Sequence, residues 1–246
     1  MSEPILLTLA ALVTATISGT FGMAGGALLI GIMASLGMDM ATAVPVHGAV
    51  QLISNATRTF AHAGNVRRQH FIWHALVLLP FPFLGVMVAA WMPEQGLRLF
   101  LGVLIIYAAW APKWGLQSLP DKPAFMLSGA VAGFFGVIIG ASGPLIAPFF
   151  LRPSFDRHQL IATKAACQLF NHFVKIVAFS ALSFSFVDEL DLIVPMGVAV
   201  IAGTYIGKAL LKHIDEKRFK LGYRVLLTGL AARILWTAAR AWAGAA

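Results

Sequence analysis

Charge is scarce in this chain of 246 residues, and acidic charge is absent from its apolar stretches. Only 11% of the residues are charged, whereas a soluble domain carries about 25%. The ten acidic residues all fall at the ends of apolar segments. Cation transporters and proton pumps bury carboxylates, and membrane metalloenzymes or aspartyl proteases need them as ligands or acid–base groups. The placement of the acids therefore speaks against all of these classes.

Cysteine and the common hydrolase motifs are also missing. Cys167 is the only cysteine, which excludes an intrachain disulfide and a cluster of thiolate metal ligands. The sequence contains neither His-Glu-x-x-His nor Gly-x-Ser-x-Gly, and residues 1–4 lack the basic region of a signal peptide. We therefore expect no catalytic residues, no metal, no cofactor and no cleaved leader.

Long uncharged runs take up most of the chain. Residues 4–38, 69–93 and 123–151 contain no Asp, Glu, Lys or Arg. A helix needs about 20 apolar residues to span a bilayer, so the sequence predicts an all-α polytopic membrane protein in contact with lipid. The apolar segments are residues 4–20, 23–37, 41–61, 70–91, 98–112, 123–138, 141–151, 158–183, 192–211 and 219–240.

Two of these segments, 23–37 and 141–151, are too short for a comfortable span, and each follows a glycine-rich break. We expect each break to join two short helices or a re-entrant pair that returns the chain to its starting side. With that topology most basic residues of the connections gather on one side, whereas the acidic cluster 188–191 lies on the other. The positive-inside rule then predicts that the basic side is cytoplasmic and that both termini lie outside.

The two halves of the chain resemble each other. The pattern Gln-Leu-x-polar-polar-x-x-cation at 51–58 recurs 117 positions later at 168–175, and Gly26 matches Gly143 at the same offset. Each half makes an odd number of crossings in this topology, so the halves are predicted to be inverted relative to each other. The fold expected is two inverted repeats, residues 1–115 and 116–246, each with a Gly-broken short-helix or re-entrant pair plus three spanning helices. Secondary transporters are often built this way.

The repeated pattern places polar side chains on one face of each helix, because positions i, i+4 and i+7 share a face. Such stripes on apolar helices face a cavity or a neighbouring helix rather than lipid. One interpretation is an anion site made of amide donors and a cation; the other is hydrogen bonding that holds the helices together. The candidate substrate-binding residues are Gln51, Asn55 and Arg58 in the first stripe and Gln168, Asn171, His172 and Lys175 in the second.

Lys175 is the strongest electrostatic candidate, because it lies deep in its segment and no acidic residue is available at that depth. A charge there is costly unless it is paired, and the substrate itself would supply the counter-charge. The alternative is a neutral Lys175 that hydrogen-bonds to Asn171 or to a carbonyl. His47 follows Pro45 inside an apolar segment and is either a proton shuttle or a structural histidine.

The glycine-rich breaks are a second set of candidates. Backbone N–H groups at the start of a short helix suit an anion, whereas glycine also lets helices pack closely. We expect close packing at Gly19 and Gly133. The breaks contribute the candidate substrate-binding residues Gly22, Gly25, Gly26, Gly140, Ser142 and Gly143.

These breaks resemble those of a known family. The first reads Gly-Thr-Phe-Gly-Met-Ala-Gly-Gly-Ala-Leu-Leu-Ile at 19–30, and the second runs from Gly133 to Ile146 with Gly-Ala-Ser-Gly-Pro at 140–144 in place of a Gly-Gly pair. Together with the duplicated layout over residues 5–240, they resemble the TauE/SafE sulfite exporter (TSUP) family. The resemblance implies transport of sulfite or small organosulfur anions across the bacterial inner membrane.

The expected function is therefore a secondary transporter that exports sulfite or a small sulfonate anion. The formal net charge of +8 fits cytoplasmic loops rather than nucleic-acid binding. A homodimer is a further expectation. Two alternatives remain open: a passive anion channel, and a membrane-embedded enzyme that resembles lipid phosphatases.

Overall fold

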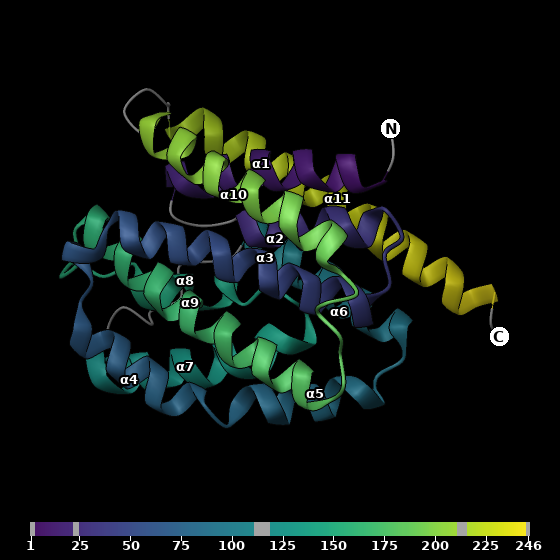
Figure 1. The fold of residues 1–246 in the computed structure, drawn as a ribbon, viewed down its shortest axis with the longest axis horizontal. Helices are drawn as coiled ribbons and strands as arrows, with labels where there is room; N and C mark the ends of the chain where they lie inside the picture. Colours follow the sequence, from purple (N-terminus) through teal and green to yellow (C-terminus); the bar gives the residue numbers. More distant parts are fainter. Residues whose placement is uncertain (1–2, 22–24, 111–118, 211–215, 245–246) are drawn as a thin grey trace.

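The computed structural model describes residues 3–21, 25–110, 119–210 and 216–244, and within these ranges it contains helices and no strands. Most of the helices run lengthwise along one direction and form a single bundle (Figure 1). Their order is α1 (Glu3–Phe21), α2 (Gly25–Ser35), α3 (Met40–Ala61), the 3-10 turn η1 (Ala63–Asn65), α4 (Arg68–Leu78), α5 (Phe81–Trp91), α6 (Glu94–Trp110), α7 (Asp121–Ile138), α8 (Gly143–Phe150), α9 (Arg157–Ala181), α10 (Leu190–Leu210) and α11 (Glu216–Gly244).

The helices follow the predicted apolar segments with one difference. Residues 70–91 were expected to form one span, but the chain breaks between Leu78 and Phe81 and bends by 45° between α4 and α5. Pro80 and Pro82 explain the break, because neither has an N–H group to donate to the preceding turn. Among the described residues, α10 alone is long and apolar enough to cross a membrane, and α4 with α5 passes the same test as a pair.

Acidic residues cap the N-terminal ends of α3 and α9, which explains why these helices begin where they do. Asp39 caps α3 by accepting a hydrogen bond from the Thr42 backbone N–H at 2.9 Å. Asp156 caps α9 in the same way and forms a capping box with Gln159. Such caps satisfy backbone donors that have no partner inside the helix. The two carboxylates thus lie at the ends of these helices and leave their middle parts free of acidic charge.

Helices α3 and α9 lie side by side and run in opposite directions. The rings of His47 and His172 are 6.0 Å apart, and those of His62 and His158 are 6.1 Å apart. Elsewhere glycines bring helices close: a Cβ on Gly19 would lie 2.7 Å from the Thr204 carbonyl oxygen of α10. A Cβ on Gly133 would come within 3.0 Å of α5 and the end of α4. The close-packing interpretation of Gly19 and Gly133 is therefore confirmed.

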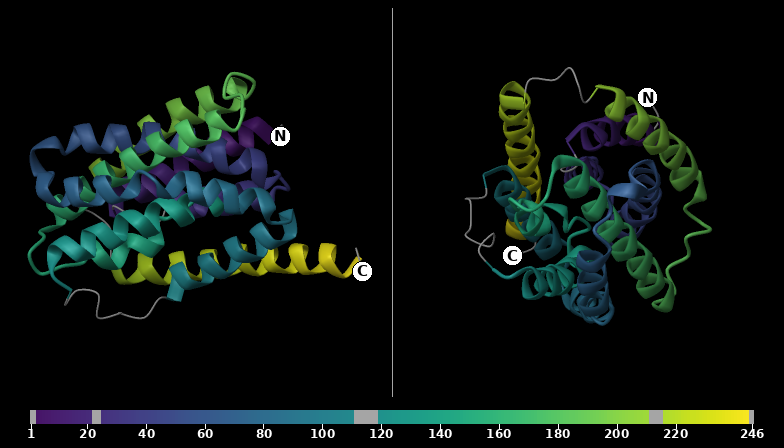
Figure 2. Two further views of the ribbon diagram at one scale, coloured as in Figure 1. Left: turned by 90° about the horizontal axis from the view of Figure 1, so that it is seen from below. Right: turned by 90° about the vertical axis from the view of Figure 1, so that its left-hand side faces the viewer.

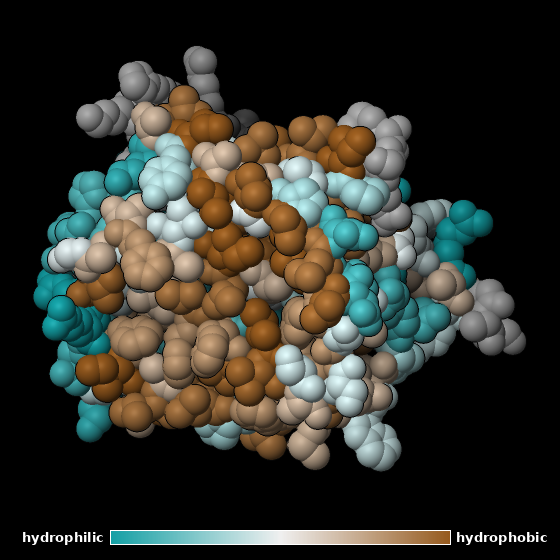
Figure 3. Space-filling model, in the orientation of Figure 1, coloured by the Kyte–Doolittle hydropathy of each residue, from teal (hydrophilic) through white to brown (hydrophobic). Residues whose placement is uncertain are grey.

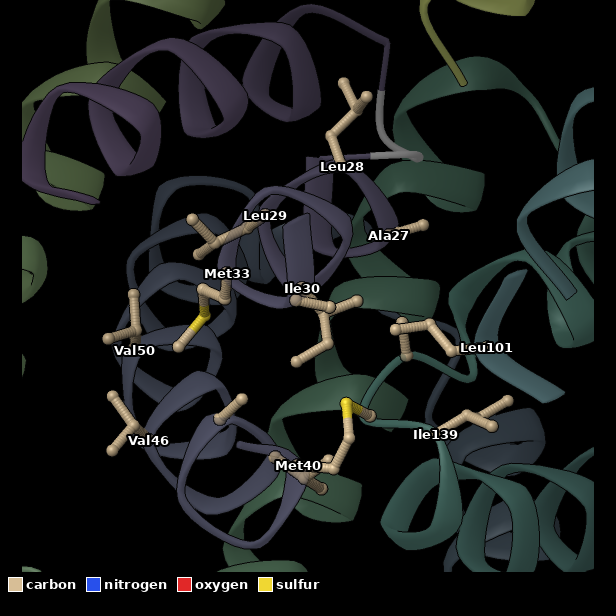
Figure 4. Packing of buried hydrophobic residues seen from close by; sticks show 14 of the residues in the cluster. Ala27, Leu28, Leu29, Ile30, Met33, Met40, Val46, Val50, Leu101 and Ile139 are labelled. Carbon is tan, nitrogen blue, oxygen red and sulfur yellow. The ribbon is translucent and has the colours of Figure 1, made fainter. Parts of the chain in front are cut away.

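Helix α2 lies in the interior of the bundle, with eight of its eleven residues buried. Leu28, Leu29, Ile30 and Met33 are fully buried, and Figure 4 shows them packed against α3, α6 and the segment after α7. This uncharged helix of 11 residues thus contacts protein rather than lipid.

The face of the molecule seen in Figure 3 has an apolar middle with hydrophilic regions at both ends. In Figure 3 the brown, hydrophobic atoms cover the middle of the face, and teal atoms lie at its left and right ends. Large apolar side chains such as Met87 of α5 and Val198 of α10 are more than half exposed. Helix α1 begins and α11 ends at the same end of the bundle (Figure 2). An apolar surface band is what a bilayer requires of a protein that crosses it.

Candidate functional site

A polar cavity of about 40 Å³ lies between α3 and α9, beside the first turns of α2 and α8. A single water molecule needs roughly 10–15 Å³ of such space, so the cavity accommodates a ligand of a few heavy atoms. Its lining combines amide, hydroxyl, imidazole and cationic groups with the glycines of both breaks. The lining residues are Ser18, Gly26, Ala27, His47, Gln51, Asn55, Arg58, Ala141, Ser142, Gly143, Pro144, Lys164, Ala165, Gln168 and His172.

The first predicted stripe forms the α3 wall of this cavity. Asn55 donates to the Gln51 carbonyl at 2.8 Å, and its own side-chain oxygen accepts from Arg58 Nη1 at 3.3 Å. Arg58 Nη2 donates to Ser54 Oγ, while Arg58 Nε is buried without a partner among the described residues. These bonds hold the guanidinium against its own helix and turn it toward the cavity.

The second stripe forms the α9 wall together with the break before α8. Ser142 Oγ donates to Gln168 Oε1 at 3.3 Å, and Asn171 Nδ2 donates to Ser142 Oγ at 3.1 Å. Asn171 is fully buried behind this pair and does not line the cavity. Its amide therefore positions Ser142 and Gln168, and these two residues face the cavity.

The glycines of the breaks divide into two groups. Gly26 and Gly143 line the cavity. A Cβ on Gly26 would lie 3.4 Å from the Gln51 amide, and a Cβ on Gly143 would lie 3.4 Å from the Gln168 amide. Gly25 instead packs on α1, because its Cβ would come within 2.2 Å of the Thr14 carbonyl oxygen. Gly140 adopts a positive φ of 80°, which only glycine adopts readily. Gly22 lies outside the described residues.

Lys175 lies behind this wall rather than in it. Its ammonium group donates to the Gly140 carbonyl at 2.9 Å, and the side chain is fully buried against Gly48. No acidic residue in the described ranges pairs with it. Lys175 thus fixes the break before α8, from which Ser142 and Gly143 reach the cavity.

Sequence reasoning left Lys164 out of the predicted site, although it lines the cavity and is only 3% exposed. A signal was present, because Lys164 follows His47 by the repeat offset of 117 positions. His47 also lines the cavity, and its Nε2 lies 2.9 Å from the Gly26 carbonyl oxygen. The repeat therefore places a basic side chain at this position in both halves.

The electrostatic character of the site is cationic. Arg58 and Lys164 line the cavity, and among the described residues no carboxylate does. Beyond it, at the end of α3, burial and then the charge of Lys208 lower the pKa of His62 below its ordinary value. Since the helix N-termini of α2 and α8 add partial positive charge, this arrangement suits a small anion.

Comparison with known proteins identifies the family. No curated protein and no solved structure matches the chain. The family model described as sulfite exporter TauE/SafE matches residues 7–234, nearly the whole chain. The members of that family are integral membrane transporters. This chain therefore belongs to the TauE/SafE family of sulfite exporters.

Proposed function

We propose that the protein is a secondary transporter that exports sulfite or a small organosulfur anion such as a sulfonate across the bacterial inner membrane. The observation that carries the proposal is the cavity between α3 and α9, whose described lining contains the buried side chains of Arg58 and Lys164 and no carboxylate. Two buried cations without acidic partners favour a negatively charged ligand, because it supplies the counter-charge that burial requires.

The size and donors of the cavity support a compact oxyanion. About 40 Å³ leaves room for a group with few heavy atoms. The amide N–H groups of Gln51 and Gln168 lie around it as hydrogen-bond donors, and the Ser142 hydroxyl, which donates to Gln168 Oε1, helps to orient the second amide. Charge-assisted hydrogen bonds from such donors to an oxyanion are stronger than neutral ones. We therefore place the sulfonyl or sulfite group between Arg58, Lys164 and these side chains.

The first turns of α2 and α8 complete the proposed site. Gly26 and Ala27 reach the cavity from α2, and Ser142 and Gly143 reach it from the start of α8. Backbone N–H groups at these positions have no partner within the helix and point toward the N-terminal end. An anion bound there interacts with the dipoles of both short helices.

We further propose that the two halves are inverted repeats, meeting at α3 and α9. Helix α1 of the first half packs on α10 of the second, and the corresponding α7 packs on α4 and α5. Helices α6 and α11, which correspond to each other, also pack together. A two-fold relation in the membrane plane produces such reciprocal contacts. The boundary between residues 115 and 116 lies outside the described residues, and a homodimer stays a prediction.

The residues that separate two cavities support a transporter rather than an open channel. A second, apolar cavity of about 360 Å³ lies near the opposite end of α3, where Val44 and Phe179 line it. Gly140 lies close to Ile30 and Val44, because a Cβ on it would be 2.9 Å from the first and 3.6 Å from the second. Figure 4 shows Ile30 among packed apolar side chains. This barrier fits a protein that opens to one side at a time.

A thermal-shift screen of purified protein against sulfite, sulfate, thiosulfate and ethanesulfonate tests the proposal. A ligand that binds the native state raises its stability by mass action, by about 2.7 kcal/mol at one hundred times its dissociation constant. We expect saturable stabilisation by at least one of these anions and counterflow of the same anion in proteoliposomes. Flux without counterflow would indicate a channel, and hydrolysis of a phospholipid head group would indicate an enzyme.

A further inference from the structure

His47 of α3 and His172 of α9 bring two imidazole rings together at the wall of the polar cavity. The ring centroids are 6.0 Å apart, and the planes meet edge to face at 75°. Both residues line the cavity and are at most 4% exposed. Each half of the chain thus contributes one histidine to the proposed anion site.

Each of these rings has a nitrogen that the protein leaves unpaired. Nδ1 of His47 and Nδ1 of His172 are buried without a hydrogen-bond partner among the described residues. Nε2 of His47 contacts the Gly26 carbonyl, and since a carbonyl only accepts, this nitrogen carries the hydrogen. Nδ1 of a neutral His47 is then a free base. Burying a polar atom without a partner carries an uncompensated desolvation cost, so a native structure that keeps two of them in one cavity requires an explanation.

A proton on Nδ1 would give the ring of His47 a second donor. The carbonyl of Gly26, in the first turn of α2, already contacts this ring. The carbonyl of Gly140, just before α8, also faces the ring but lies outside hydrogen-bond geometry. An imidazolium at this position therefore has an acceptor near it from each glycine-rich break. Protonation of His47 would draw together the two segments that form the anion site.

Burial, and then the charges around the pair, govern when the proton can bind. Lys175 of α9 faces both rings, and Arg58 and Lys164 line the same cavity. No carboxylate of the described residues lies among them. These cations oppose a further positive charge while the cavity is empty, and a bound anion offsets them.

We propose that the anion site binds a proton together with the anion, and that the imidazoles of His47 and His172 hold this proton. The inference rests on the function proposed above. Linkage is reciprocal, so the anion promotes protonation and a lower pH promotes anion binding to the same extent. Imidazole is suited to this role, because it is the side chain that ordinarily titrates between about pH 5 and 8.

Other groups in the described region are poorly placed to hold the proton. The acidic side chains lie at helix ends, as Asp39 and Asp156 do. Lys175 already donates to Gly140. The thiol of Cys167 is buried and does not line the cavity. Lys164 is a further titratable group of the cavity, but the histidine pair is the part of the described lining that offers imidazole nitrogens without a partner, so we place the proton there.

The test is isothermal titration of the purified full-length protein with sulfite and with ethanesulfonate, in buffers of different ionisation enthalpy, between about pH 5.5 and 8. Ethanesulfonate keeps the same charge over this range. Sulfite changes its own protonation state over this range, and it does so equally for every variant. The difference in proton uptake between wild type and variant therefore reports on the protein. We expect proton uptake with the anion and an affinity that rises toward about tenfold per pH unit for one linked proton.

The variants His47→Gln, His172→Gln and the double variant identify the groups involved. We expect the double variant to bind the anion with little proton uptake and with an affinity that no longer rises on acidification. His158→Gln removes an exposed histidine at the start of α9 and should keep the wild-type pH dependence. Thermal unfolding shows whether each variant is folded.

Two results would overturn the inference while leaving the transport function intact. One is binding of ethanesulfonate by the wild type without proton uptake, which needs no variant to interpret because this ligand keeps its charge. The other is an unchanged pH dependence in the folded double variant, which would place the proton elsewhere. If none of the four screened sulfur anions binds at any pH, the proposed function itself fails.

Discussion

Arg58 of α3 and Lys164 of α9 line one cavity, and neither forms an ion pair with an acidic residue in the described part of the chain. They are 5% and 3% exposed, and they come from different halves of the sequence. Removing a charge from water costs several kcal/mol unless a partner compensates. A mobile anion is a partner that this arrangement can accept and release.

Removing either charge should weaken anion binding. We expect Arg58→Gln and Lys164→Gln each to lower the affinity for the bound sulfur anion at least tenfold, since a charge-assisted hydrogen bond contributes about 1.5–3 kcal/mol. The melting temperature without anion should stay the same or rise, because an uncompensated buried charge is removed. Titration calorimetry and thermal unfolding of the same preparations measure both quantities.

Two further variants serve as controls for this prediction. Lys122→Gln removes an exposed charge at the start of α7 and should leave the affinity unchanged, while Arg58→Lys keeps the charge and should retain part of the binding. If both glutamine variants bind like the wild type, the cavity is not an anion site.

Adjacent glycines should respond differently to the same substitution. Gly25→Ala places a Cβ within 2.2 Å of the Thr14 carbonyl oxygen and 2.6 Å of the Ser18 Cβ, so we expect a loss of stability of a few kcal/mol from overpacking. The Cβ of Gly26→Ala meets only Gln51 and His47, at 3.4 Å or more. That variant should fold normally and bind the anion more weakly. Equal melting temperatures for the two variants would contradict this assignment.

The sequence predicts the helices of the site better than the residues within them. The polar stripes of α3 and α9 follow from helical spacing alone, and the structure brings both to one cavity. Lys164 is recognisable in the sequence as a basic residue inside an apolar segment, but it lies outside the repeated polar pattern at 168–175 and was therefore left out of the predicted site. Helical spacing identifies a face, but the neighbours of that face depend on how the two helices cross.

Tertiary contacts also determine whether a glycine packs against a neighbouring helix or lines the cavity. Gly25 and Gly26 look equivalent in the sequence, yet one meets α1 and the other meets Gln51. The break between α4 and α5 was missed because hydropathy does not register the backbone effect of Pro80 and Pro82. Lys175 was correctly placed deep in its helix, while its contact with Gly140 depends on a loop 35 residues away.

The predicted orientation in the membrane can be tested by labelling single cysteines in intact cells. Gly64→Cys and Ser154→Cys introduce exposed thiols at the end of the bundle expected to be cytoplasmic, and Asp188→Cys introduces one at the other end. Cys167 is fully buried, so it should give little background. A membrane-impermeant maleimide should label position 188 and not positions 64 or 154. The reverse pattern would mean that both termini lie in the cytoplasm.

Lys175 provides the most discriminating test of the electrostatic proposal, because its contacts allow two accounts. In one, its charge anchors the anion from behind the break before α8; in the other, its hydrogen bond to Gly140 only supports the fold. Lys175→Arg keeps the charge, Lys175→Gln keeps a hydrogen-bond donor, and Lys175→Met keeps most of the stem that packs on Gly48.

We expect Lys175→Gln and Lys175→Met to lose at least tenfold in anion affinity, and Lys175→Arg to retain more of it than either. The physical reason is that a charge acts over a longer distance in a poorly solvated interior than a hydrogen bond does. A purely structural role would instead lower the melting temperature of the methionine variant and leave the affinity of the folded glutamine variant unchanged. Affinity and unfolding temperature measured on all three variants therefore separate the two accounts, and wild-type affinity in Lys175→Gln would exclude the anchor.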